Sequence, residues 1–384
     1  MGSRPRRVLC APDSFKESLS AQEVAAAMAI GVAKADPAIV CDQCPLADGG
    51  EGSLDILIGA MKGTIHHATV TGPLGEPVRG RFGIAGGGKT AVVELAEASG
   101  LALIPVHRRD PTRTTTYGTG ELIAAAASCG CETVVVCIGG SGTVDGGAGI
   151  AQALGGRFFD RSGMLLDQPL TGGTLHEVSR YEPPLGLPRI RVACDVNNPL
   201  CGPKGAAAVY GPQKGATPQQ VRLLDSALSH LASLCRGDPN MPGAGAAGGV
   251  GFGLVALCGA QLEPGIELVL DAVEFARRCE RADLVLTGEG CLDSQSLHGK
   301  ATIGVAKAAW DLSVPTIAIV GQTGPGADAC VDTATGGWLA GIVSLSDRYG
   351  RQRSLAEPAT LLAEAAAEVV RGWHGGRRGP RTPI

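Results

Sequence analysis

Aromatic side chains are scarce in this sequence, since phenylalanine, tryptophan and tyrosine together make up only 3% of its 384 residues. Proteins that stack nucleic-acid bases rely on aromatic platforms, so we do not expect such a platform here. An excess of positive charge is lacking too, because 33 lysines and arginines stand against 37 aspartates and glutamates, for a net charge of −4. We therefore predict no nucleic-acid partner and no anionic membrane surface as a partner.

Long apolar runs are also missing, because no stretch reaches the ~18 residues of a membrane-spanning helix. The first apolar stretch is interrupted by Pro12, Asp13 and Lys16, which argues against a signal peptide. The thirteen cysteines are scattered through apolar segments, as is typical of buried thiols in a reduced compartment. We predict a cytoplasmic protein, either a monomer or a homodimer.

Glycine, in contrast, is abundant: 58 residues, roughly twice the usual share of about 7%. The glycines have no Gly-X-Y period, which excludes a collagen-like chain. The 44% of hydrophobic residues excludes a disordered one. Glycine suits tight turns and places where the backbone must approach a ligand closely. The fold therefore needs backbone without side chains at many positions.

Strand and helix patterns alternate at both ends of the chain, which is typical of parallel βαβ units. Near the N-terminus, Ser20 and Glu23 have the spacing of a capping box in front of a helix. The middle of the chain differs, since residues 64–105 have the short β-rich runs and turn signals of hairpins. The pattern predicts an α/β protein with a doubly wound parallel-sheet domain built from both termini. The predicted parts are that domain (1–64 and 284–372), an inserted mixed α/β domain (65–283) and a disordered tail (373–384).

Five loops share one design, in which Asp, Glu, Ser, Thr or Lys follow an apolar segment, and in four of the five these residues stand with glycines. Ligands of open α/β sheets bind at the carboxyl ends of the strands. Glycine turns that lead into helices present N–H groups to anions, and nearby carboxylates suit a Mg²⁺ ion that neutralises phosphates. A single loop of this kind can be only a turn, but five favour phosphoryl transfer from a nucleotide. They are residues 13–16, 47–52, 139–147, 194–202 and 287–293.

Residues 83–90 (GIAGGGKT) match the P-loop pattern G-x-x-x-x-G-K-[ST]. A true P-loop follows a strand and opens a helix, with its lysine, here Lys89, on the phosphates. Here Thr90 starts a β-branched run, so a hairpin turn is the favoured interpretation and a P-loop NTPase remains an alternative. The sequence contains no G-x-S-x-G or H-E-x-x-H motif, and none of its seven histidines stands out as catalytic.

These loops resemble those of the type 1 glycerate kinases, from about Val8 to about Ser346. The resemblance implies ATP-dependent, Mg²⁺-requiring phosphorylation of D-glycerate to 2-phosphoglycerate. It also implies a flavodoxin-like domain with an inserted second domain and an active site in the cleft between them. Departures from the family pattern are Glu17, Gly142, Val144 and Ser296. The matching stretches are 11–16 (APDSFK), 45–52 (PLADGGEG), 139–147 (GGSGTVDGG), 194–200 (CDVNNPL), 210–216 (YGPQKGA), 242–249 (PGAGAAGG) and 287–290 (TGEG).

The loop chemistry and the resemblance together assign expected roles. Asp195 closes a predicted strand and is expected to accept the proton of the reacting hydroxyl, and Lys16 is the second expected catalytic residue. The other predicted site residues are Asp13, Ser14, Asn198 and Lys214 for the substrate, Gly139, Gly140, Ser141, Thr143, Gly146, Gly288 and Lys300 for the nucleotide, and Asp48, Glu51, Glu289 and Asp293 for the metal.

Two alternatives to this function stay open besides the P-loop NTPase. A glycerate 3-kinase would give 3-phosphoglycerate from the same loops. A non-catalytic protein that binds a sugar acid or a nucleotide would show binding without turnover, although the number of carboxylates in the loops argues against it.

Overall fold

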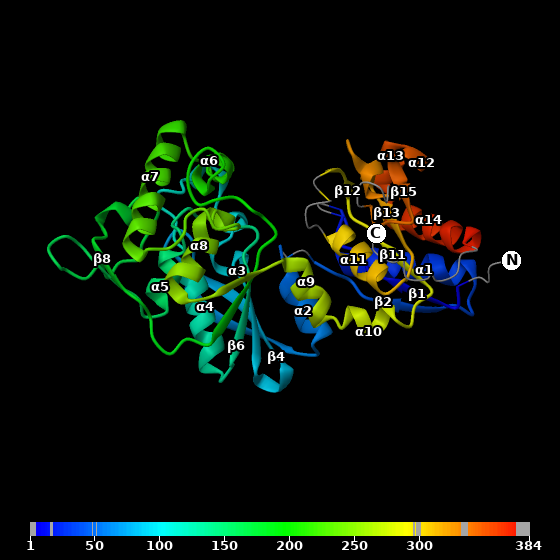
Figure 1. Ribbon diagram of the computed structural model, residues 1–384, viewed down its shortest axis with the longest axis horizontal. Coiled ribbons are helices and arrows are strands. Elements are labelled where there is room, and N and C mark those ends of the chain that lie inside the picture. Colours follow the sequence, from blue (N-terminus) through cyan, green and yellow to red (C-terminus); the bar gives the residue numbers. More distant parts are fainter. Residues whose placement is uncertain are drawn as a thin grey trace, which may run out of the picture. The chain divides into compact units, whose positions relative to one another are not determined.

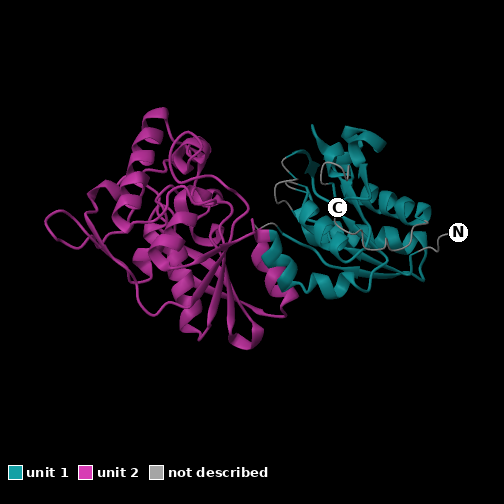
Figure 2. Ribbon diagram, viewed as in Figure 1, with its two compact units in different colours: residues 1–48, 266–384 teal, residues 49–265 magenta. Residues whose placement is uncertain are grey.

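The computed structural model describes residues 5–15, 18–47, 49–50, 52–294, 296, 301–331 and 337–373. The chain forms two compact units, one from residues 1–48 and 266–384 and the other from residues 49–265 (Figure 2). Each unit contains a parallel or mostly parallel sheet with helices packed against it (Figure 1). The α/β class is therefore confirmed.

The first unit is built on a five-stranded sheet in which every neighbouring pair is parallel. Numbered along this unit alone, its strands have the order 2-1-3-4-5, which is the flavodoxin-like order. Two further short strands form a parallel pair outside this sheet, and in the sequence they come directly after the third and the fourth strand of the unit. The sheet consists of β1 (Arg7–Cys10), β2 (Val40–Gln43), β11 (Leu284–Thr287), β13 (Thr316–Val320) and β15 (Gly341–Ser344), and the small pair of β12 (Cys291–Leu292) and β14 (Gln322–Thr323).

The predicted capping box begins the first helix of this unit. The Ser20 hydroxyl accepts from the Glu23 N–H, and the Glu23 carboxylate accepts from the Ser20 N–H at 2.8 Å. The helix packs against the last helix of the described residues, and Val24 and Met28 are fully buried with Leu361 from that helix. The helices are α1 (Ala21–Ala35), α9 (Gly265–Ala272, whose first residue belongs to the second unit), α10 (Phe275–Cys279), α11 (Ala301–Asp311), α12 (Leu345–Tyr349), α13 (Arg351–Ala356) and α14 (Pro358–Gly372).

The second unit has a six-stranded sheet that begins as an antiparallel meander and continues as parallel strands. The hairpins predicted over residues 64–105 are thus confirmed. The strands in spatial order are β10 (Gln261–Glu263), β9 (Arg189–Ala193), β6 (Thr133–Cys137), β5 (Thr90–Glu94), β4 (Pro77–Ala85) and β3 (Thr64–Thr71), with a separate antiparallel pair of β7 (Arg157–Phe159) and β8 (Arg180–Glu182).

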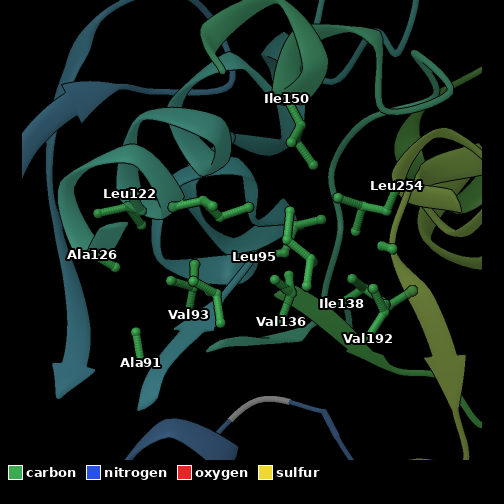
Figure 3. Close-up of a cluster of buried hydrophobic side chains, with 14 of the residues drawn as sticks. Ala91, Val93, Leu95, Leu122, Ala126, Val136, Ile138, Ile150, Val192 and Leu254 are labelled. Atoms are coloured by element: carbon green, nitrogen blue, oxygen red, sulfur yellow. The ribbon is translucent and has the colours of Figure 1, made fainter. Parts of the chain in front are cut away.

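One hydrophobic cluster of this unit lies between the sheet and the helices on one of its faces (Figure 3). Val93, Val136 and Val192 from adjacent strands meet Leu122 and Leu254 from two helices, and all five side chains are fully buried. Burying one such side chain contributes about 1.5–3 kcal/mol. The helices are α2 (Ser53–Ala60), α3 (Ala96–Ser99), α4 (Tyr117–Ser128), α5 (Ala148–Ala153), α6 (Ala206–Tyr210), α7 (Pro218–Cys235) and α8 (Ala246–Cys258).

The compact units divide the chain at other positions than the predicted domains, which placed the borders after residues 64 and 283. Helix α2 belongs to the second unit because it packs against β4, where a Cβ on Gly83 would lie 2.1 Å from Ile58. Helix α9 belongs almost wholly to the first unit, and its Ile266 packs against Gly304 of α11. Of the predicted tail, residues 374–384 lie outside the described residues.

No helix in the described part of the chain has both the length and the apolarity required to cross a bilayer. All thirteen cysteines are described, and none of them is in a disulfide. The pair Cys41 and Cys44 contributes to no cluster of three or more metal-ligating side chains among the described residues.

Candidate active site

In the first unit, the loops that follow β1 and β11 are tied together at the carboxyl edge of the sheet. The Asp13 N–H donates to the Gly288 carbonyl at 2.9 Å, and the Thr287 hydroxyl donates to the Ala11 carbonyl at 2.8 Å. The chain leaves β1 towards β2 on one side, whereas β11 lies on the other side, so this is the topological switch point of the sheet. Ligands of such sheets bind at this position.

A pocket of about 350 Å³ opens at this switch point. The predicted residues Asp13, Ser14 and Glu289 line it together, and the two carboxylate residues are only 9% and 8% exposed. Mg²⁺ prefers carboxylate oxygens and usually takes only one or two of them, with water and phosphate completing its shell. Although the described residues include no cluster of three or more metal-ligating side chains, this pair fits a phosphate-bound Mg²⁺.

Asp293, a further predicted metal ligand, lies just after β12 in the same unit. Its carboxylate accepts from the Ser296 N–H at 3.2 Å and so closes a turn. Lys16, Asp48, Glu51 and Lys300, which the sequence predicts as catalytic, metal-binding and nucleotide-binding residues, lie outside the described residues.

In the second unit, the segment before α2 lies close to the carboxyl ends of two parallel strands, β6 and β9. A Cβ on Gly139 would lie 2.6 Å from the Cα of Gly50, and a Cβ on Gly49 would lie 3.0 Å from the Cβ of Ala193. Glycine at positions 139 and 49 allows these segments to approach so closely, because a side chain at either position would clash. Residues 49–50 therefore lie next to the start of loop 139–147 and to the end of β9, where loop 194–202 begins.

Glu94, which the sequence analysis did not single out, holds one of these loops in place. It ends β5, is 4% exposed, and accepts from the N–H groups of Gly52 at 3.0 Å and Leu54 at 3.1 Å. A carboxylate at this position stabilises the N-terminus of α2. Burial raises the pKa of Glu94, and the two N–H groups oppose that rise. A carboxylate directly after an apolar β-branched run was the signal that could have identified it.

Lys214 is buried against the loop that follows β6. Its ammonium donates to the Thr143 carbonyl at 2.6 Å and to the Ser141 hydroxyl at 3.1 Å, and the residue is 3% exposed. Two of its three donors therefore brace the loop itself. Burial lowers the pKa of Lys214 to about 7, although the nearby Asp145 carboxylate favours the charged form.

Several N–H groups of the same loop donate to other groups of the protein. The N–H of Gly142 donates to Ser99 at 2.9 Å, that of Gly146 to Gly248 at 3.1 Å, and that of Thr143 to the Ser141 hydroxyl at 3.2 Å. A phosphate cradle presents N–H groups to the ligand instead. These three amides, two of them at positions predicted to bind nucleotide, hold the shape of the loop.

The Asp145 side chain also holds this loop in place through hydrogen bonds. Its fully buried carboxylate accepts from the N–H of Thr116 at 2.8 Å, from the hydroxyl of Thr116 at 2.7 Å and from the N–H of Gly147 at 3.2 Å. Burial raises the pKa of Asp145, and the hydrogen bonds from Thr116 oppose the rise. Gly248 at the start of α8 packs against the same loop, since a Cβ there would lie 2.0 Å from the Thr143 carbonyl oxygen.

Asp195 and Asn198 lie on the loop that follows β9. The Asp195 carboxylate accepts from the Gly265 N–H at 2.7 Å, which fixes its orientation beside the end of β10. The Asn198 amide donates to the Lys204 carbonyl at 2.9 Å, and its oxygen accepts from the Tyr210 hydroxyl at 2.8 Å. Asn198 therefore stabilises the conformation of its own loop through both the nitrogen and the oxygen of its side-chain amide.

Comparison with known proteins identifies a family in which this combination of loops occurs. The model of the glycerate kinase family matches residues 8–374. The chain belongs to the glycerate kinase family. A kinase transfers a phosphoryl group to an acceptor, so the family assigns the chain a phosphotransferase activity on a small molecule, with ATP as the phosphate donor.

Several glycerate kinases are similar over most of their length. The chain is 51% identical over 326 residues to "Glycerate kinase" of Bacillus subtilis (strain 168), and 47% identical over 326 residues to "Glycerate 2-kinase" of Escherichia coli (strain K12). Each alignment covers 82% of this chain and 85% of the relative. The crystal structure of a candidate glycerate kinase 2 from Salmonella typhimurium LT2 has a TM-score of 0.81, with 42% identity, and covers 95% of this chain and 97% of that one.

The P-loop alternative is wrong for this glycerate kinase family member. Strands β4 and β5 are antiparallel, and Gly86–Gly88 forms the turn between them, with positive φ at all three glycines. The motif therefore opens a strand and not a helix, and Lys89 lies on the surface in an ion pair with Glu132 at 3.1 Å. Turn chemistry alone explains why these residues match the phosphate-loop pattern.

We expect Lys89→Ala to leave nucleotide affinity and turnover unchanged. The Lys89 side chain is 69% exposed, and a surface ion pair contributes only about 0–1 kcal/mol to stability. Steady-state kinetics with varied ATP checks this. A large rise in KM for ATP in this variant would restore the P-loop interpretation.

Lys214 makes the stability of the second unit depend on pH. Its pKa falls from 10.5 to about 7 on folding, so the unfolded chain binds more protons between these values. The free energy of unfolding should therefore rise with pH from about 7 to about 10.5, by up to about 1.4 kcal/mol per pH unit, and this contribution is lost as pH falls back to 7. Urea unfolding of the wild type and of Lys214→Met, followed by circular dichroism between pH 7 and 10, checks it. A difference between the two proteins that stays constant with pH would contradict a buried, easily deprotonated Lys214.

Proposed function

We propose that this chain transfers the γ-phosphoryl group of ATP to the 2-hydroxyl of D-glycerate in a Mg²⁺-dependent reaction. The observation that carries the proposal is the pair of buried carboxylates, Asp13 and Glu289, in one pocket at the switch point of a flavodoxin-like sheet in a glycerate kinase family member. The choice of the 2-hydroxyl rests on the relative named glycerate 2-kinase, at 47% identity.

Asp195 is the proposed general base. It directly follows β9, and its hydrogen bond from the Gly265 N–H holds the carboxylate in one orientation. A base that takes the proton from the attacking hydroxyl as the bond to phosphorus forms typically contributes 10²–10⁴-fold to the rate. Lys16 is proposed to offset the negative charge of the phosphoryl group during transfer.

Asp13 and Glu289 are the residues that would hold Mg²⁺, which supplies positive charge to the phosphates when bound. Asp48, Glu51 and Asp293 stay in the proposal as further ligands, directly or through water. Because Asp13 accepts from the Ser14 N–H at 2.6 Å, the carboxylate is already oriented by its own loop.

The loops of the second unit are proposed to bind the anionic ends of the reactants. Ser141, Thr143 and Lys214 are joined to one another by hydrogen bonds. Asn198 holds the conformation of its own loop through its hydrogen bond to the Lys204 carbonyl. Gly139, Gly140 and Gly146, with Gly288 and Lys300 of the first unit, remain the proposed contacts to nucleotide phosphates. Ser14 remains a proposed substrate contact.

The test is the release of ADP from ATP with and without D-glycerate. We expect ADP formation to require glycerate, to stop when EDTA removes divalent cations, and to resume when Mg²⁺ is restored. ADP formation that proceeds equally without glycerate would contradict the proposed acceptor, and turnover that is unaffected by EDTA would contradict the proposed metal.

A cytoplasmic location is also proposed. Thirteen cysteines without a disulfide, six of them buried, are what a reducing compartment permits.

A further inference from the structure

The pocket beside Asp13 and Glu289 is larger than glycerate needs. Its volume of about 350 Å³ falls within the range of about 300–1,000 Å³ that holds drug-sized ligands. Glycerate has only three carbons and four oxygens. The extra space extends to α13 and to the start of α14, which contribute Arg351, Leu355 and Pro358 to the lining.

One face of α13 is directed to this pocket. Arg351, Ser354 and Leu355 have the i, i+3, i+4 spacing that places side chains on the same side of a helix, and Pro358 at the start of α14 also lines the pocket. None of these residues belongs to the glycine loops from which the function was predicted. The pocket therefore has a second wall of its own chemistry.

The pocket lining formed by α13 and its neighbours includes an exposed apolar side chain. Leu355 lies at the pocket and is 69% exposed, Pro358 lines the pocket beside it, and Phe15 from the loop after β1, which is 4% exposed, completes the apolar lining. Ordered apolar side chains around a concave site are typical of pockets that bind a flat, mostly apolar group. Glycerate, which carries a polar group on every carbon, has nothing to place against them.

The polar part of the wall offers acceptors and a cation. The Ser346 hydroxyl donates to the Gly321 carbonyl at 2.8 Å, and the Ser354 hydroxyl donates to the same carbonyl at 3.4 Å. A hydroxyl whose proton is used in this way keeps lone pairs that accept from a ligand. Arg351 brings a guanidinium group, which suits phosphate oxygens.

We infer that this pocket binds the nucleoside part of ATP. The base contacts Leu355, Phe15 and Pro358, the ribose hydroxyls donate to Ser346 and Ser354, and Arg351 contacts the phosphates on their way to the Mg²⁺ held by Asp13 and Glu289. A Mg²⁺-bound nucleoside triphosphate presents the same three chemistries as the pocket lining: an apolar ring, hydroxyl donors and metal-bound phosphates. The inference rests on the proposed function, since it identifies where that reaction takes its donor.

The test is calorimetric binding of Mg²⁺·ADP, which needs no turnover. We expect Leu355→Asp and Arg351→Met each to weaken ADP binding by about 10-fold or more, because one places a charge against the base and the other removes a phosphate contact. Glycerate affinity should stay unchanged. Matched controls are Leu185→Asp, at a 90% exposed leucine in the second unit, and Arg353→Met, at an arginine of α13 outside the pocket lining. If Leu355→Asp does not fold, Leu355→Gln replaces it.

Wild-type ADP affinity in both pocket variants would overturn the inference while glycerate-dependent turnover still supported the proposed function. Weaker glycerate binding with unchanged ADP binding would also overturn it, because the pocket would then bind the acceptor. Conversely, a wild-type protein that binds ADP through Leu355 and Arg351 but does not phosphorylate glycerate would support the pocket assignment and refute the proposed function.

Discussion

Replacing Asp195 by Asn should lower kcat by about 10²–10⁴-fold, because an amide cannot accept the proton of the glycerate hydroxyl. The local structure should survive the change, since an amide oxygen can still accept from the Gly265 N–H as the carboxylate does at 2.7 Å. KM for ATP should change little, because the nucleotide is proposed to bind elsewhere. Steady-state kinetics with both substrates varied checks the prediction.

Asp225→Asn is the matched control for this variant. Asp225 also accepts from a glycine N–H, that of Gly202 at 2.8 Å, but it lies on α7 and has no proposed catalytic role. Full activity in the control and a large loss in Asp195→Asn would identify the base. Near-wild-type turnover in Asp195→Asn would remove Asp195 from the mechanism.

Replacing Gly248 by Ala should lower the free energy of unfolding by about 2–5 kcal/mol, combining backbone strain with overpacking. Its φ of +77° disfavours any side chain, and the added Cβ would lie 2.0 Å from the Thr143 carbonyl oxygen. Because Thr143 is in the loop that Lys214 and Asp145 hold, the clash should displace that loop. Denaturant unfolding measures the loss of stability, and kinetics the loss of activity.

Gly259 provides a control on the same helix. It ends α8 with a φ of +68°, but a Cβ there would meet no atom within 4 Å. Gly259→Ala should therefore cost only about 1–2 kcal/mol for the left-handed backbone. Equal losses in the two variants would show that the backbone conformation, and not close packing against the loop, explains the glycine at position 248.

The sequence was most informative where the determining contacts are local. The capping box of Ser20 and Glu23 predicts the start of α1, and the β-branched run after Lys89 identifies a hairpin turn in a segment that matches a phosphate loop. Both depend on residues a few positions apart. The glycine loops likewise mark the carboxyl ends of strands, because a chain that leaves a buried strand must turn there.

Contacts between distant segments could not be predicted in the same way. Glu94 caps a helix about forty positions earlier in the chain, and Lys214 donates to Thr143, which lies 71 positions before it. Nothing near either residue indicates these partners. Gly248 belongs to a glycine-rich stretch that matches the family, and the structure uses it for close packing of backbone on backbone. The abundance of glycine therefore has two physical causes, and composition alone cannot separate them.

The most direct test of the proposed reaction is a proton-coupled ³¹P NMR spectrum of the product formed from ATP, Mg²⁺ and D-glycerate. A phosphate on the 2-hydroxyl is attached to a carbon with one hydrogen, so we predict a new ester signal split into a doublet. A triplet would show phosphorylation of the 3-hydroxyl, since that carbon has two hydrogens. ADP with inorganic phosphate and no ester signal would contradict the kinase reaction itself.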